Sequence, residues 1–196
     1  KRQQFMNPVI ERLGLRFADG IIVSPSEVNL DDLVAANIKE GAAKVSENYI
    51  RYFRSGYSIM TPSACAVEVI DSAKGFEITE VLASAGKGSW VEKETTDFIN
   101  EKSVLNPAVG EVEKSNSIML YLTRPVNNKE QRIFVIGDAD CISTLELSQN
   151  RPGFRSSNFT LITETFRNLS YGEFPVEASR VNPPDDRVLV TRNVIF

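Results

Sequence analysis

Apolar residues near the end of the chain recur at the spacing of one helical face. They are separated by three or four positions: Phe159, Ile162, Phe166 and Leu169. Ser156 or Ser157 is suited to the N-cap position before this stretch, and Gly172 is suited to the end of the helix. The pattern predicts a helix over residues 157–169.

Two further helices are predicted nearer the start of the chain. Asn7 followed by Pro8 is typical of an N-cap with proline at the first helical position, and this short helix would end at Gly14. Residues 40–54 alternate apolar and charged side chains at roughly helical spacing, and Gly56 follows them. We therefore expect one short and one longer helix before the first long extended region.

Several short apolar segments are typical of β-strands: residues 21–23, 57–60, 64–70 and 76–85. Residues 29–38 fit either an extended segment or a helical turn. Residues 118–123 and 132–136 each contain a continuous apolar run, which is typical of parallel strands buried on both faces. Two late strands are expected over residues 176–180 and 187–191. Together with the helices, these segments predict an α/β fold with an open, mostly parallel sheet and flanking helices.

A long polar segment interrupts this pattern at about residues 86–110. It is rich in Gly, Ser, Thr and Asn and is longer than most connections in a compact domain, so we expect a surface excursion from a single domain spanning residues 1–196. The excursion carries the only tryptophan, Trp90, together with Phe98. Trp90 could fold back onto the local core, or it could contact a partner protein.

Composition and charge exclude several function classes. The 196 residues are 42% hydrophobic, which is enough for a buried core. The net charge is −4 and no run of Lys and Arg exceeds two, so nucleic acid is not an expected partner. The chain has no histidine, which removes the usual general base, the usual zinc ligand and every catalytic triad that contains histidine. No apolar run approaches the ~20 residues of a membrane span.

The sharpest local motif follows the apolar run at residues 132–136. Gly137, Asp138 and Asp140 come directly after it, and in a parallel sheet they would lie at the carboxyl edge, where open α/β folds bind ligands. Two carboxylates there could hold Mg²⁺, as in phosphotransferases of the haloacid dehalogenase type. That family expects Thr or Val where this chain has Ile142, and a downstream Lys. Alternatively, the two acids accept backbone N–H bonds within the turn.

The two cysteines, Cys65 and Cys141, each lie among apolar neighbours. This setting predicts buried free thiols, with a disulfide as the alternative. A catalytic role for Cys141 is not expected, because a cysteine nucleophile needs a histidine base.

Several motifs occur in a characteristic order along the chain. Residues 132–140 read Arg, four apolar residues, Gly, Asp, Ala and Asp. Asn158 then opens the predicted helix, Asn168 lies near its end, and a Gly-acid turn follows at Gly172. Two upstream stretches belong to the same series of motifs: residues 7–23 and 76–90. In this order the motifs resemble the GldG-like proteins, which are auxiliary components of uncharacterised ABC transport systems linked to gliding motility.

The resemblance implies a fold, a location and partners. The implied fold is an α/β domain similar to glutamine-amidotransferase-like and flavodoxin-like sheets but without catalytic residues. The implied location is periplasmic, in a bacterial inner-membrane protein with membrane helices flanking this segment, and the implied partners are the permease and ATPase subunits. The absence of an initial methionine and the apolar end at residues 194–196 are expected of an excised segment. The chain departs from the family pattern at Cys141 and at Leu169-Ser170, where the family often has Phe and Trp-Leu.

We therefore expect a non-catalytic extracytoplasmic auxiliary domain of an ABC-type transport or gliding system, which binds partner proteins or a ligand and uses no cofactor or metal. The candidate binding residues are Asp138, Asp140, Trp90 and Asn158. One alternative is a Mg²⁺-dependent phosphotransferase that uses Asp138 and Asp140. Another is a carbohydrate-binding module with Trp90 and Tyr171 as the stacking residues.

Overall fold

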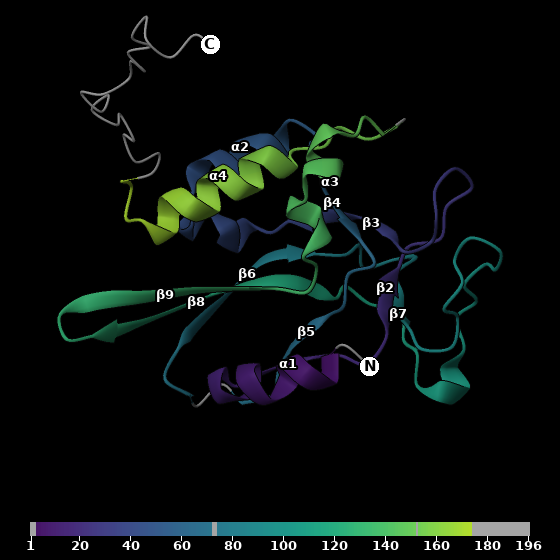
Figure 1. The fold of residues 1–196 in the computed structure, drawn as a ribbon, viewed down its shortest axis with the longest axis horizontal. Helices are drawn as coiled ribbons and strands as arrows, with labels where there is room; N and C mark the ends of the chain where they lie inside the picture. The colour runs from purple at the N-terminus through teal and green to yellow at the C-terminus, as the bar shows by residue number, and fades with distance from the viewer. Residues whose placement is uncertain (1–2, 72–73, 152, 174–196) are drawn as a thin grey trace, which may run out of the picture.

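The centre of the molecule is a five-stranded antiparallel sheet with the strand order β4-β3-β6-β8-β9 (Figure 1). This computed structural model describes residues 3–71, 74–151 and 153–173. The strands of the central sheet are β3 (Leu33–Ile38), β4 (Ile59–Pro62), β6 (Glu77–Ala83), β8 (Ser117–Val126) and β9 (Lys129–Ile136). Two small antiparallel sheets accompany it: β1 (Leu15–Phe17) with β5 (Val67–Val69), and β2 (Ile21–Val23) with β7 (Trp90–Glu92).

The prediction of an open, mostly parallel sheet is wrong, and strands β8 and β9 show why. Both strands occur where the continuous apolar runs were found, but they form an antiparallel hairpin joined by Asn127 and Asn128. Both of these residues have positive φ, 48° and 63°, as a type I′ hairpin turn requires. Parallel strands would need a much longer crossover connection.

The continuous apolar run of β8 has a different cause from parallel pairing. All of residues 118–122 are buried, because both faces of the sheet are covered. Met119 and Tyr121 belong to the core on one face, while Leu120 and Leu122 belong to the core on the other. Burial on both faces therefore determines the run, whatever the direction of the neighbouring strand.

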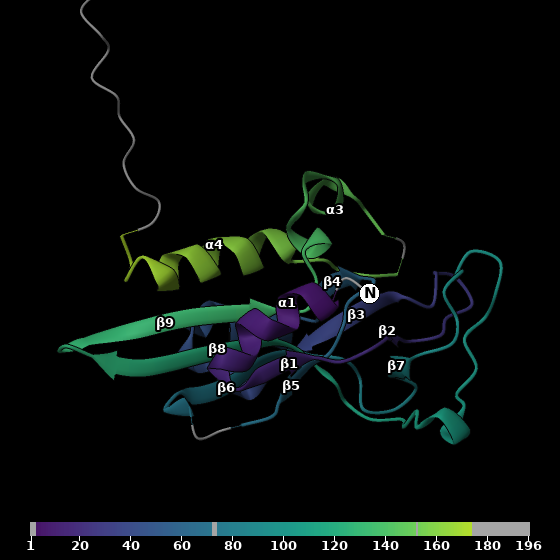
Figure 2. The same ribbon diagram turned by 60° about the horizontal axis from the view of Figure 1, so that its bottom comes forward.

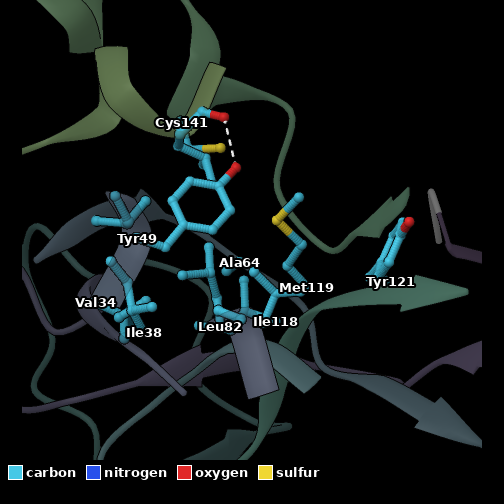
Figure 3. Packing of buried hydrophobic residues seen from close by; sticks show 14 of the residues in the cluster. Val34, Ile38, Tyr49, Ala64, Leu82, Ile118, Met119, Tyr121 and Cys141 are labelled. Carbon is cyan, nitrogen blue, oxygen red and sulfur yellow. Dashed lines mark hydrogen bonds between the residues drawn. The ribbon is translucent and has the colours of Figure 1, made fainter. Parts of the chain in front are cut away.

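Helices cover the two faces of the sheet unequally. Helices α2 (Glu47–Arg54) and α4 (Asn158–Leu169) lie over one face, and α1 (Gln3–Ile10) lies on the other with the β1–β5 pair (Figures 1 and 2). Figure 3 shows Tyr49 of α2 pointing into the larger core, where its hydroxyl donates to the carbonyl of Leu161 at 2.9 Å. The remaining helical elements are short: η1 (Glu11–Leu13), η2 (Glu40–Lys44), η4 (Pro107–Val109), η5 (Asp140–Ile142) and α3 (Thr144–Ser148).

The local predictions fared better than the predicted sheet topology. The helix predicted at 157–169 is confirmed as α4, and residues 33–38 of the ambiguous segment are extended, as β3. The predicted helix at 40–54 is divided into η2 and α2 at Ser46, whose hydroxyl accepts the N–H of Asn48. The strands predicted at 176–180 and 187–191 lie outside the described residues.

The predicted N-cap at Asn7 is wrong, because α1 begins at Gln3. The Asn7 side chain instead pairs with the backbone of Phe17: its Oδ1 accepts the N–H at 2.9 Å and its Nδ2 donates to the carbonyl at 3.1 Å. Through these two bonds the amide group holds the outer side of β1. Over the described part of the chain, every helix is too short or too polar to cross a bilayer.

Candidate functional site

Three of the four candidate residues meet at the turn that follows β9. The Asn158 side chain donates from Nδ2 to the carbonyl of Cys141 at 2.8 Å, and the N–H of Asp140 donates to Oδ1 of Asp138 at 2.7 Å. Trp90 lies apart from them, in β7. Since β9 is an outer strand of an antiparallel sheet, the expected site at the carboxyl edge of parallel strands does not form.

Gly137 allows the chain to turn here because another segment lies against its backbone. Its carbonyl accepts the N–H of Cys65 at 3.0 Å, and a Cβ added to Gly137 would lie 1.9 Å from the carbonyl oxygen of Cys65. Only glycine fits at that distance. The segment before β5 is thereby held against the end of β9.

Asp138 is 6% exposed and only half of its carboxyl group has a partner. Oδ1 accepts the Asp140 N–H, while Oδ2 is buried without a hydrogen-bond partner among the described residues. Burial is the main reason that the pKa of Asp138 is raised to about 7, and the negative charges of Asp140 and Glu146 add to it against the backbone donors. The group is suited to hold a proton near neutral pH.

The two acids of the motif do not converge on a common point of space open to a cation. Asp138 is buried and Asp140 is exposed on the first turn of η5. Over the described residues, no group of three or more acidic, cysteine or histidine side chains is arranged to hold a metal ion. The hydrogen bond from the Asp140 N–H agrees with the interpretation that Asp138 organises the turn.

Both cysteines are free, with Cys141 buried and Cys65 half-buried. The Cys65 thiol donates to the Gly137 carbonyl at 3.2 Å, and the Cys141 thiol donates to the Asp138 carbonyl at 3.3 Å. Burial raises the pKa of Cys65 to about 11 and that of Cys141 to about 12. At neutral pH both groups are therefore protonated and poorly nucleophilic.

All the hydrogen-bonding capacity of the Asn158 side chain is used within the chain. Oδ1 accepts from the Met60 N–H and from the Ser156 hydroxyl, and Nδ2 donates to the carbonyls of Met60 and Cys141. Asn158 is 2% exposed. Its amide therefore acts like one residue of an added strand on the outer side of β4, as Asn7 does on β1.

The predicted excursion contains the strand β7 and the short helix η4, and Trp90 is 7% exposed within it. Trp90 pairs with Val23 between β7 and β2, and its indole Nε1 donates to Glu92 at 3.1 Å. This burial is what the core interpretation of Trp90 expects. The larger of the two described surface cavities, about 620 Å³, lies between α1, β1 and the excursion, and none of the four candidate residues lines it.

Buried carboxylates, which sequence reasoning missed, organise the excursion. Three consecutive backbone N–H groups point at two of them: that of Lys93 donates to Glu111, and those of Glu94 and Thr95 donate to Glu92. Burial would raise the pKa of Glu92. The hydrogen bonds that Glu92 accepts, from the N–H groups of Glu94 and Thr95 above all, outweigh this effect, and the pKa is lowered. No periodic pattern marks such acids, since each accepts bonds from neighbours that the loop itself brings into place.

An apolar surface lies on the outer side of the helical layer. The stripe that predicted α4 points to solvent: Phe159 is 67% exposed and Phe166 50%. The buried positions of α4 are instead Asn158, Leu161 and Glu164. Exposed apolar side chains also lie on η5 and α3, two short elements that contact α4. We name the whole set the helical patch: Ile142, Leu145, Phe159, Phe166 and Leu169.

Tyr171 lies just beyond this patch, next to the hairpin. The guanidinium of Arg132 lies 4.2 Å from the centre of the Tyr171 ring, and the Tyr171 hydroxyl donates to the carbonyl of Glu130.

Comparison of the chain with family models, with curated proteins and with solved structures finds no match.

Proposed function

We propose that this domain is a non-catalytic protein-binding module, the extracytoplasmic auxiliary domain of a bacterial ABC-type transport or gliding-motility system. The observation that carries the proposal is the helical patch. Phe159 and Phe166 lie two turns apart on the outer face of α4, and Leu145 of α3 is 69% exposed next to that helix. Large apolar side chains grouped on a surface are typical of a protein interface.

The chemistry of the patch favours one kind of partner segment. An apolar stripe at helical spacing fits a second helix that lays its own apolar face along it. Beside the stripe, Arg167 pairs with Glu164 and the Arg155 guanidinium lies over the Tyr57 ring, so we expect the contact with the partner to be mainly apolar. We propose that the partner segment is an extracytoplasmic helix of the permease, the membrane subunit that the resemblance implies.

The two alternative functions have less support. The phosphotransferase would use Asp138 and Asp140, of which one is buried and the other exposed. The carbohydrate-binding module would stack sugars on Trp90 and Tyr171, but Trp90 is buried and the Arg132 guanidinium lies over the ring of Tyr171. Titration of Mg²⁺ into the purified domain should give no saturable heat under the binding proposal.

The test is co-purification of the tagged domain with the permease and ATPase subunits that this proposal requires in the organism that makes the protein. Phe159→Ser combined with Leu145→Ser should reduce recovery of the permease at least tenfold, while thermal stability stays nearly unchanged because these side chains are 67% and 69% exposed. Phe5→Ser is the matched control, since Phe5 is 84% exposed on α1 at the opposite side of the sheet. Equal recovery with the double variant, or no recovery with the wild-type domain, would contradict the proposal.

A further inference from the structure

The two outer strands of the central sheet differ in how their free sides are treated. The outer side of β4 is closed by residues 155–158: the N–H of Ser58 donates to the Arg155 carbonyl at 2.9 Å, and the N–H of Ser157 donates to the Ser58 carbonyl at 3.0 Å. The Asn158 amide then pairs with Met60. On β4 the backbone groups that could accept another strand are thus already occupied.

The outer side of β9 is open in its second half. The N–H of Gly137 donates to the carbonyl of Ile118 at 2.8 Å, which fixes the phase of the β8–β9 ladder. In that phase three residues of β9 direct both their N–H and their C=O away from β8: Arg132, Phe134 and Ile136. Across the described ranges, no backbone group outside the β8–β9 ladder bonds to these residues.

Two contacts set the limits of this open edge. At one end the Tyr171 hydroxyl donates to the carbonyl of Glu130, the next outward-pointing residue. At the other end Gly137 is held against Cys65. Between them, residues 132–136 contain no Pro, no Gly and no bulge, which are three of the devices that prevent an exposed strand from pairing, and the guanidinium of the one charged residue, Arg132, lies over the Tyr171 ring.

We propose that a second copy of this chain pairs with the open edge, β9 against β9 in the antiparallel direction, about a twofold axis at Phe134. In this register Arg132 lies opposite the partner's Ile136, and Phe134 opposite the partner's Phe134. The three outward residues are evenly spaced about Phe134, so all their N–H and C=O groups find partners at once in six hydrogen bonds. A second copy presents an open edge of the same length with the same two limits, so neither strand is left with unpaired groups, and this match favours a second copy over an unrelated strand.

The side chains of the pairing residues are compatible with this arrangement. Phe134 is half-buried and stacks on Tyr121, with ring centroids 4.6 Å apart, so the two copies would bring their Phe134 rings together on one face of a continuous sheet. A ladder of five residues per chain is short, and the interaction is therefore weak and concentration-dependent. It uses a different surface from the helical patch and goes beyond the proposed function.

Disulfide trapping between two single-cysteine variants tests the register. Arg132→Cys and Ile136→Cys carry different tags and are mixed under a mild glutathione redox buffer. The mixture should give a cross-linked heterodimer at least tenfold above the homodimer of either variant alone, because two copies of residue 132 would lie roughly 14 Å apart along the strands. The wild-type chain, with Cys65 and Cys141 retained, is the control and should not cross-link.

Sedimentation of the wild-type chain provides a second measurement that needs no substitution. The average mass should rise toward that of a dimer as concentration increases to the millimolar range. A monomer throughout that range with no cross-linked heterodimer would overturn the proposal, as would Arg132→Cys homodimers as abundant as the heterodimer. Neither result would bear on binding of the permease, which is measured at the helical patch.

Discussion

Asp138 in the turn after β9 and Asp31 beside the excursion are both buried, yet the pKa of one is raised and that of the other is lowered. Asp138 accepts the N–H of Asp140, but its second oxygen has no partner and two acids lie nearby. Asp31 is 0% exposed, but it accepts the N–H of Ser103 at 2.7 Å and the Nζ of Lys102 at 3.0 Å.

The difference shows that the supply of donors, more than burial itself, decides the charge of a buried acid. At Asp31, burial would raise the pKa, but the Ser103 N–H and the charged Lys102 outweigh it. Glu92 follows the same rule in the excursion. The excursion is therefore held by ionised carboxylates, whereas the turn after β9 is built to hold a proton.

The largest effect is expected at Trp90, which is buried on β7 opposite Val23 and donates to Glu92. Trp90→Ala should lower the free energy of unfolding by about 3–5 kcal/mol, because it removes a buried aromatic side chain. Trp90→Phe keeps most of the ring and loses only the indole donor, so about 1–2 kcal/mol is expected. Urea unfolding followed by circular dichroism measures both. A cost below 1 kcal/mol for Trp90→Ala would show that the residue is not part of the core.

Asp138 should make the wild-type protein less stable as the pH rises. The pKa is about 7 in the folded state and near 3.8 when the chain unfolds, so the folded state binds the extra proton between these values. The free energy of unfolding therefore decreases as the pH rises from 4 to 7, by at most about 4 kcal/mol.

Asp138→Asn removes this titration, since the amide is neutral at every pH. The variant should have a flatter stability profile between pH 4 and pH 8 and should be more stable than the wild type at pH 8. Chemical denaturation at a series of pH values compares the two. Parallel profiles for wild type and variant would refute the assignment of the raised pKa.

Asp31 should give the opposite dependence. Its folded-state pKa is lowered, so its contribution is complete above the unfolded value of 3.8 and disappears as the pH falls through the folded pKa. Asp31→Asn should cost about 1.5–3 kcal/mol at pH 7, the usual contribution of a hydrogen bond to a charged group, and less in acid. Denaturation at pH 7 and pH 3 measures the change, and an equal cost at both would count against an ionised Asp31.

The smallest effect is expected at Lys102, the exposed partner of Asp31. Its side chain is 66% exposed, so Lys102→Met should cost only about 0.2–1 kcal/mol. The same denaturation experiment at low and high salt measures it. A cost as large as that of Asp31→Asn would mean that the ion pair, rather than the Ser103 N–H, keeps the carboxylate charged.

Local preferences in the sequence were enough to locate many of the elements. The period of α4 and the extended runs of β8 and β9 depend on residues close together in the chain. The antiparallel direction of β9 also had a local signal, because Asn127 and Asn128 leave only two residues between the strands. The continuous apolar character of the strands outweighed that signal and led to the wrong fold class.

The tertiary structure alone decided which side chains are covered. An apolar stripe at helical spacing usually faces the core, yet Phe159 on α4 faces solvent while Asn158 and Glu164 are buried. Asn158 is buried because it pairs with Met60, 98 positions away. Asp138 holds its proton because the Cys65 segment and α4 close over the turn. A repeating pattern records the preferences of neighbouring residues, but burial and the supply of hydrogen-bond donors depend on segments that meet only when the chain folds.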